Sequence, residues 1–124
     1  MVGHLGEDLP WFYAACDLIA LASFYEGLPT VIPEAWASGR PVVAPRVTGL
    51  GELLADGGGV LAESPGSTDL ARALGACRER LSAGDPEFSA SALRERSEPY
   101  DWERVVDATV AVYESAREHR CASS

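Results

Sequence analysis

The chain of 124 residues contains no lysine, so its ten basic side chains are all arginines, set against 19 acidic ones. The formal net charge is −9. Proteins that bind nucleic acids or anionic membrane surfaces use clusters of basic side chains, which displace counterions from phosphates. No such cluster is visible, so the sequence argues against nucleic acid and against a membrane surface as partners.

Long hydrophobic runs are also missing. No apolar stretch approaches the roughly 20 residues of a membrane-spanning helix, and the chain does not open with a charged and then apolar leader. The three cysteines, Cys16, Cys77 and Cys121, are odd in number and far apart, which fits neither a metal site nor a disulfide framework. We expect reduced thiols in a cytoplasmic protein, with Cys16 and Cys77 filling the core and Cys121 in a frayed tail.

Three signatures of catalytic chemistry are absent. No D-x-D pair is present to hold Mg²⁺ through carboxylates, so we expect neither a metal nor another cofactor. Two histidines do not allow a Ser-His-Asp arrangement to be assembled, and we assign His4 to a turn or cap and His119 to the polar tail. Gly49-Leu50-Gly51 begins like a dinucleotide fingerprint, but Leu54 stands where the third glycine belongs, which places a nicotinamide-dependent enzyme far behind other hypotheses.

What the sequence does contain is a strand, a loop, a helix and a second strand in succession. Leu18–Ala22 and Pro41–Ala44 are short apolar runs, typical of strands in a parallel sheet that is buried on both faces. Ligands of such sheets collect at the carboxyl ends of the strands, which is where residues 23–30 lie. The sequence therefore predicts an α/β fold with a ligand site in this loop.

Two prolines fix the start of the helix between the strands. Pro33 lacks an N–H and is tolerated only in the first turn, so we expect Thr30 as the N-cap and Val31 as the first helical residue. Amides from Leu28 to Ile32 would point out of the helix start, where the macrodipole favours a diphosphate without a metal.

Two carboxylates lie eight positions apart, Glu26 in the loop and Glu34 in the first helical turn. Glu34 can accept hydrogen bonds from the vicinal hydroxyls of a ribose, while Glu26 faces the position of a sugar beyond the phosphates. Gly27 lets the backbone pass close to a ligand. An acidic residue in a first turn is also expected simply because it offsets the dipole, so the spacing alone leaves both interpretations open.

Longer segments carry a family resemblance. They read D-L-P-W-F-Y-A-A-C-D, then S-F-Y-E-G-L-P-T-V-I-P-E-A-W-A-S-G-R-P-V-V-A, then T-G-L-G-E-L-L-A-D-G-G-G-V-L, and finally Y-D-W-E-R-V-V-D-A-T-V-A-V-Y-E. The stretch from Leu9 to Leu61, which contains nearly all of the first three segments, resembles the carboxy-terminal domain of retaining GT-B glycosyltransferases of the family 4, or group 1, type. The last is similar to the family's closing helix. The resemblance implies a doubly wound, Rossmann-like parallel sheet, forming part of a GT-B carboxy-terminal domain.

The resemblance also implies a function and a set of site residues. The function is retaining transfer of a hexose from a UDP-, GDP- or ADP-type donor, with the nucleotide sugar as the small-molecule partner. Glu34 matches the glutamate that binds the donor ribose, and Glu26 the one that contacts the transferred sugar. Four further positions match residues that meet the sugar and the diphosphate, chiefly through backbone amides: Gly27, Leu28, Thr30 and Val31. Ala22 stands where the family usually carries proline, a residue that stiffens the loop and is not a ligand.

We expect residues 1–124 to form one domain, with the sheet and donor motif in 1–61 and mainly helices in 62–124. The family's basic pair for the donor phosphates and its acceptor-side domain have no counterpart here, so the chain would be incomplete on its own. The alternative is a non-catalytic interaction module that retains the fold. Met1–His4 would then be an unpaired strand edge that recruits a protein partner or a second copy to complete the sheet.

The remaining segments are expected to be scaffold. We predict helices over Pro10–Ala15, Glu52–Ala55, Asp69–Leu81 and Pro86–Arg96, and a strand over Val60–Leu61. The last helix carries a continuous apolar stripe of Trp102, Val105, Val106, Thr109, Val110 and Tyr113. A stripe of this kind is typical of core packing.

Overall fold

The structure is a computed structural model that describes residues 6–27 and 29–122, with side chains up to His119. The strand edge expected at Met1–His4, the role of His4, and Leu28 therefore lie outside the described residues. So does the side chain of Cys121.

Within the described residues, three parallel strands form the sheet, in the order β1 (Ile19–Ala20), β2 (Val42–Pro45) and β3 (Gly59–Ala62). Ile19 lies opposite Val42, and Val43 lies opposite Val60. β1 is shorter than the predicted run, although the Leu21 amide still donates to the carbonyl of Val43 at 2.9 Å. All four β2 residues are buried, which confirms a strand covered on both faces.

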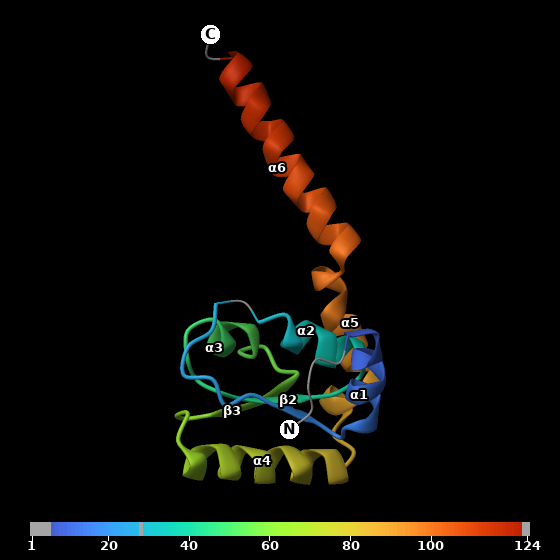
Figure 1. Cartoon of the computed structure of the whole chain (residues 1–124), viewed down its shortest axis with the longest axis vertical. Coiled ribbons are helices and arrows are strands. Elements are labelled where there is room, and N and C mark those ends of the chain that lie inside the picture. Colours follow the sequence, from blue (N-terminus) through green and yellow to red (C-terminus); the bar gives the residue numbers. More distant parts are fainter. Residues whose placement is uncertain (1–5, 28, 123–124) are drawn as a thin grey trace.

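Helices cover both faces of the sheet, which makes the fold a doubly wound α/β arrangement (Figure 1). α4 (Ser67–Ser82) lies across one face. The opposite face carries α1 (Leu9–Ala15), α2 (Val31–Ala37), α3 (Leu50–Leu53) and α5 (Ala90–Ser97). Short 3₁₀ turns complete the body: η1 (Gly6–Asp8), η2 (Pro86–Phe88) and η3 (Glu98–Tyr100).

Each face of the sheet has its own hydrophobic core, because successive side chains of a strand point to opposite sides. Val42 and Ala44 of β2 belong to the core under α2, α3 and α5, whereas Val43 belongs to the core under α4. Trp36 is the largest fully buried side chain, and its indole N–H donates to the carbonyl of Gly58 at 2.8 Å. The fixed position of α2 relative to the sheet follows from this anchor.

The segment predicted as one helix over Pro86–Arg96 is two elements, η2 and α5. Its break has a local cause, since Ser89 is extended, with φ −63° and ψ 144°. The Ser89 hydroxyl accepts from the amide of Ala92 at 3.3 Å and so begins a new helix. The Asp85 carboxylate caps the preceding turn by accepting from the amide of Glu87 at 3.0 Å. The helix predicted over Glu52–Ala55 also differs, because α3 begins two residues earlier, at Leu50.

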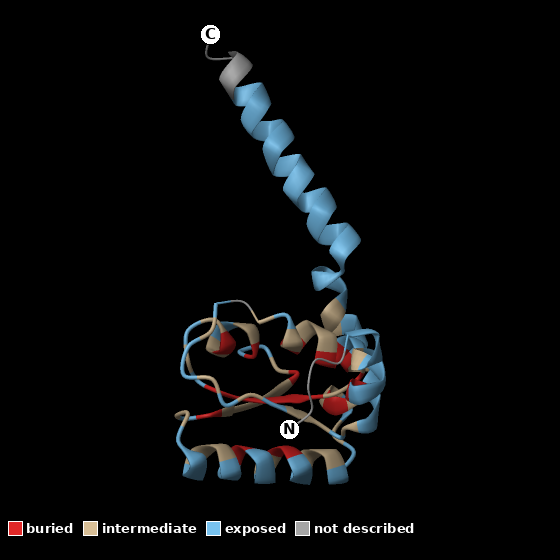
Figure 2. Ribbon diagram, viewed as in Figure 1, coloured by how far each residue is buried: buried red, intermediate tan, exposed pale blue. Residues whose placement is uncertain are grey.

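The interpretation of the last helix as core packing is wrong. α6 (Trp102–Ala122) leads away from the folded body, and every side chain described in it is exposed (Figure 2). Trp102 is 77% exposed and Tyr113 is 75% exposed. The apolar stripe therefore exists but has no cover within the described part of the chain.

The two cysteines with described side chains differ in environment. Cys77 in α4 is fully buried, and desolvation by burial raises the pKa of its thiol to about 11, against a smaller lowering by the charge of Arg80. The prediction that Cys16 fills the core is wrong. It caps the end of α1, is half-buried, and its thiol donates to the carbonyl of Phe12 at 3.2 Å.

Candidate functional site

The loop between β1 and α2 lies at the carboxyl end of the first strand, where the sequence places the site. α2 begins at Val31 with Thr30 as its N-cap, as predicted. The predicted capping bond is not formed. Thr30 has helical backbone angles, φ −62° and ψ −23°, and its hydroxyl accepts no hydrogen bond from the helix. The amide of Glu34 donates instead to the backbone carbonyl of Thr30 at 3.1 Å.

The amides at this helix start are only partly available to a ligand. The Ile32 amide donates to the carbonyl of Pro29 at 3.3 Å, which corrects the expectation that it points outward. The amides of Thr30 and Val31 have no acceptor among the residues that the structure describes. Thr30 is exposed and Val31 is half-buried, and neither amide donates to a described acceptor.

Glu34 is held by a residue that the sequence analysis did not single out. The hydroxyl of Tyr13 in α1 donates to Glu34 Oε2 at 2.8 Å. Tyr13 is only 5% exposed, and burial, followed by the hydrogen bond and the charge of Glu34, raises the pKa of its phenol. Tyr13 therefore remains a neutral donor. Its one signal in the sequence is its place in the segment D-L-P-W-F-Y-A-A-C-D.

Glu26 has a hydroxyl partner of its own. The Ser23 hydroxyl donates to Glu26 Oε1 at 2.6 Å within the same loop. No hydrogen bond joins Glu26 to Glu34 among the described residues, so the structure does not pair the two carboxylates directly.

Gly49 supports the loop from the other side. Its φ is +83°, and a Cβ at this position would overlap the carbonyl oxygen of Gly27. Only glycine allows this close approach, which packs the turn before α3 against the loop that carries Glu26. The sequence analysis did not predict this contact between Gly49 and Gly27.

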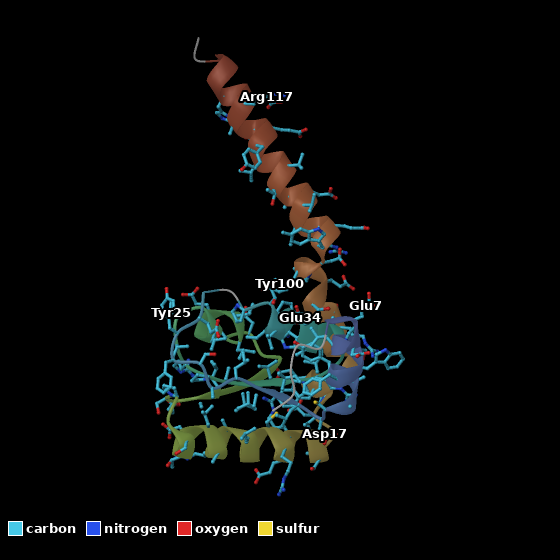
Figure 3. The ribbon with its side chains drawn as sticks, in the orientation of Figure 1. Glu7, Asp17, Tyr25, Glu34, Tyr100 and Arg117 are labelled. Atoms are coloured by element: carbon cyan, nitrogen blue, oxygen red, sulfur yellow. The ribbon has the colours of Figure 1, made fainter. Side chains whose placement is uncertain are left out.

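A surface cavity of about 460 Å³ brings some of the predicted residues together. Thr30 and Glu34 line it, together with Tyr100, Trp102 and Arg104. Figure 3 shows Glu34 and Tyr100 near each other at the top of the folded body. Glu26, Gly27 and Val31 do not line this cavity, so only part of the predicted set shares it.

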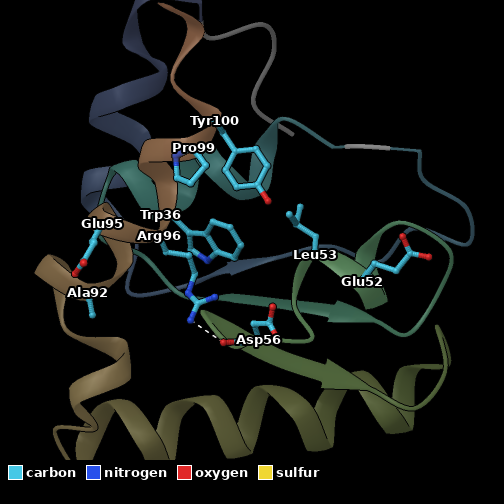
Figure 4. Close-up of a pocket in the computed structure, with 9 residues that line it drawn as sticks. All are labelled: Trp36, Glu52, Leu53, Asp56, Ala92, Glu95, Arg96, Pro99 and Tyr100. Carbon is cyan, nitrogen blue, oxygen red and sulfur yellow. Dashed lines mark hydrogen bonds between the residues drawn. The ribbon is translucent and has the colours of Figure 1, made fainter. Parts of the chain in front are cut away.

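A second cavity, of about 490 Å³, contains none of the predicted residues (Figure 4). The Arg96 guanidinium lies 5.7 Å from the Trp36 ring and donates to the carbonyl of Asp56 at 2.7 Å. The Tyr100 ring is tilted against Trp36 with 6.1 Å between centroids. Arg96 thus joins α5 to α2 and to the turn after α3, and Tyr100 packs η3 against α2.

The described residues contain neither a cluster of metal ligands nor a membrane-spanning helix. No group of three or more His, Cys, Asp or Glu side chains within them could hold a metal ion. None of the described helices is long and apolar enough to cross a membrane.

Comparison with known families identifies the chain. A family model described as "Glycosyl transferases group 1" matches residues 1–79, more than half of the sequence. The chain belongs to this family. The expected family resemblance is therefore confirmed, and so is the α/β fold of a partial GT-B domain.

Curated relatives agree with membership of the group 1 glycosyltransferases. A D-inositol 3-phosphate glycosyltransferase of Geodermatophilus obscurus is 40% identical, over 95% of this chain and 25% of its own length. The protein of the same name from Salinispora tropica is 38% identical, over 93% of this chain and 24% of its own. An MMP alpha-(1->4)-mannosyltransferase of Mycolicibacterium hassiacum is 34% identical, over 92% of this chain and 28% of its own length. The chain spans about a quarter of the length of these relatives.

Solved structures share the architecture of this chain. Sucrose-phosphate synthase from Thermosynechococcus elongatus superposes with a TM-score of 0.68 at 28% identity, covering 87% of this chain and 27% of that one. Anabaena HepE, solved in complex with UDP, superposes with a TM-score of 0.63 at 29% identity, covering 90% of this chain and 30% of that one.

Proposed function

We propose that the chain is the donor-binding part of a group 1 glycosyltransferase, holding a nucleoside-diphosphate sugar from which a hexose is transferred with retention. The observation that carries this proposal is the placement of Glu26 and Glu34 around the carboxyl end of β1, each fixed by a neighbouring hydroxyl group. Support comes from the similarity to HepE, a protein solved with UDP bound.

In this proposal each site residue has a separate task. Glu34 accepts hydrogen bonds from the ribose hydroxyls, and Glu26 contacts the sugar to be transferred. The amides of Thr30 and Val31, which donate to no described acceptor, face the diphosphate, and the partial positive charge at the start of α2 favours this anion. Gly27 and Leu28 contribute backbone contacts to the sugar. These groups stabilise the departing diphosphate and the cation-like sugar, whose charges develop in the transition state.

The chain alone is expected to bind donor weakly and to turn over little. Its basic residues near the motif are already placed elsewhere or exposed: an Arg40 guanidinium N–H donates to the carbonyl of Ala14 at 2.6 Å, and Arg46 lies on the surface after β2. We propose that neither arginine is a strong phosphate ligand. We propose that the reaction needs no metal, so that EDTA leaves donor binding unchanged. The expected reduced thiols favour a cytoplasmic location.

Calorimetric titration with UDP-glucose, GDP-mannose and ADP-glucose tests the proposal. One of these donors should give saturable heat with the wild-type chain. Glu34→Ala should weaken that donor about tenfold or more, because hydrogen bonds to a charged group contribute about 1.5–3 kcal/mol. Glu52→Ala is the matched control, since Glu52 lies in the first turn of α3 and outside this site. Equal heats from the wild type and Glu34→Ala would remove the assigned role of Glu34.

A second candidate function is a non-catalytic interaction module that retains the fold. The exposed stripe of α6 favours it, because large apolar patches on a surface mark contacts with other proteins. Such a protein should form a dimer or a stable complex in native mass spectrometry. A clean monomer that binds no hydrophobic dye contradicts this alternative.

A further inference from the structure

The two site glutamates are held in different ways. Ser23 lies three residues from Glu26 in the same loop, so that hydrogen bond moves with the loop. Tyr13 lies 21 residues from Glu34 and belongs to another helix. The Tyr13–Glu34 bond therefore fixes a carboxylate of α2 relative to α1 and the core.

The Tyr13 ring is itself rigidly held. It belongs to the hydrophobic core that includes Ile32, Ala35 and Trp36 of α2, and only its hydroxyl reaches the carboxylate. A buried tyrosine ring has two side-chain torsions, so packing leaves its hydroxyl little freedom. Glu34 by contrast has three torsions and is half-buried, so without a partner its carboxylate would sample several directions.

We propose that Tyr13 is a positioning residue that orients Glu34 toward the donor ribose. By occupying Oε2, the phenol leaves Oε1 directed at the ligand, since no described residue donates to Oε1. A carboxylate fixed before binding loses less side-chain entropy when the ribose hydroxyls arrive. The inference rests on the proposed function, because it assigns Glu34 to the ribose.

The test is a Tyr13→Phe substitution, which keeps the buried ring and removes only the hydroxyl. Tyr25→Phe is the matched control, because Tyr25 is 79% exposed in the neighbouring loop and makes no contact with Glu34. Affinities are measured calorimetrically for UDP and 2′-deoxy-UDP, and for the matching GDP and ADP pairs. Circular dichroism and thermal unfolding verify the fold of each variant.

We expect the wild type and Tyr25→Phe to prefer the ribonucleotide over its 2′-deoxy analogue. Tyr13→Phe should weaken ribonucleotide binding about five- to tenfold and leave the deoxy analogue nearly unchanged, because only the ribose contact is lost. The double variant Tyr13→Phe/Glu34→Ala should bind no more weakly than Glu34→Ala alone, since the two residues act as one unit. A merely structural role for Tyr13 would weaken both ligands equally.

Different failures have different meanings. If Glu34→Ala weakens binding but Tyr13→Phe behaves like the wild type, only the role of Tyr13 is overturned. If the wild type binds none of the nucleotides, the proposed function fails and this inference fails with it. Should Tyr13→Phe not fold, a crystal structure of the wild type with the bound nucleotide decides. It supports the inference if Tyr13 remains on Oε2 and the ribose on Oε1, and overturns it if the ribose displaces Tyr13.

Discussion

Helices α4 and α6 look alike in the sequence and are treated differently by the fold. Both carry an apolar stripe at helical spacing opposite a charged face. In α4 the stripe is covered, with Ala73 5% exposed and Cys77 fully buried beside Val43 of the sheet. In α6 the corresponding stripe, from Trp102 to Tyr113, is open to solvent. Periodicity thus identifies an apolar face but not what covers it.

The difference in burial arises from the direction in which each helix continues from the segment before it. After β3 the chain turns through residues 63–66 and α4 runs back across the sheet (Figure 1). After η3 the backbone becomes extended at Asp101, with φ −58° and ψ 135°, and α6 leads away from the body. Asp101 also caps the new helix, accepting from the amide of Glu103 at 2.9 Å. The same kind of apolar face therefore meets a sheet in one case and solvent in the other.

Hydrogen exchange should give the largest contrast between the two helices. Amides in α4 should exchange only through global unfolding, at about 5–15 kcal/mol. Amides in α6 should open at about 1–2 kcal/mol in the monomer, because a helix without tertiary packing is only marginally stable. Equal protection of both helices in a dilute monomeric sample would contradict this difference.

Substitution of two tryptophans, one in the core and one in α6, should change the free energy of unfolding by very different amounts. Trp36→Ala should destabilise the fold by about 3–5 kcal/mol, because it leaves a large cavity and removes one of the two donors to the Gly58 carbonyl. Trp102→Ala should change the free energy of unfolding by less than about 0.5 kcal/mol, since that side chain is 77% exposed. Denaturant unfolding of both variants measures the difference, and a large loss for Trp102→Ala would mean that α6 is packed in solution.

The smallest effect is a pH dependence specific to α4. Burial raises the pKa of the Cys77 thiol from its ordinary 9.0 to about 11, so the unfolded chain loses this proton first. The stabilisation is complete below about pH 9 and is lost as the pH rises through 11, amounting to about 2–3 kcal/mol.

Cys77→Ala is the control, because other groups that titrate at alkaline pH are present in both proteins. The free energy of unfolding of the wild type relative to this variant should fall by about 2–3 kcal/mol between pH 9 and pH 11 and then stay constant. A constant difference between the two would mean that the Cys77 thiol is not desolvated.

Much of the site could be predicted because its signals are local. Pro29 and Pro33 restrict where α2 can begin, and the helix does begin at Val31. The hydrogen bond from Tyr13 to Glu34 could not be predicted, because a separation of 21 residues is bridged only when α1 packs beside α2. The use of the Ile32 amide within the turn also escaped prediction, since its acceptor depends on the loop conformation.

The sequence by itself determined the acidic balance, the doubly buried strand β2, the start of α2 and the membership of a glycosyltransferase family. These follow from composition, from steric limits at proline and from the period of apolar residues, all of which act over a few neighbouring positions. Only the tertiary structure decided that Tyr13 meets Glu34, that Gly49 touches the loop at Gly27, and that α6 has an open face. Such contacts join distant segments, so they depend on how whole elements pack together and not on any local pattern.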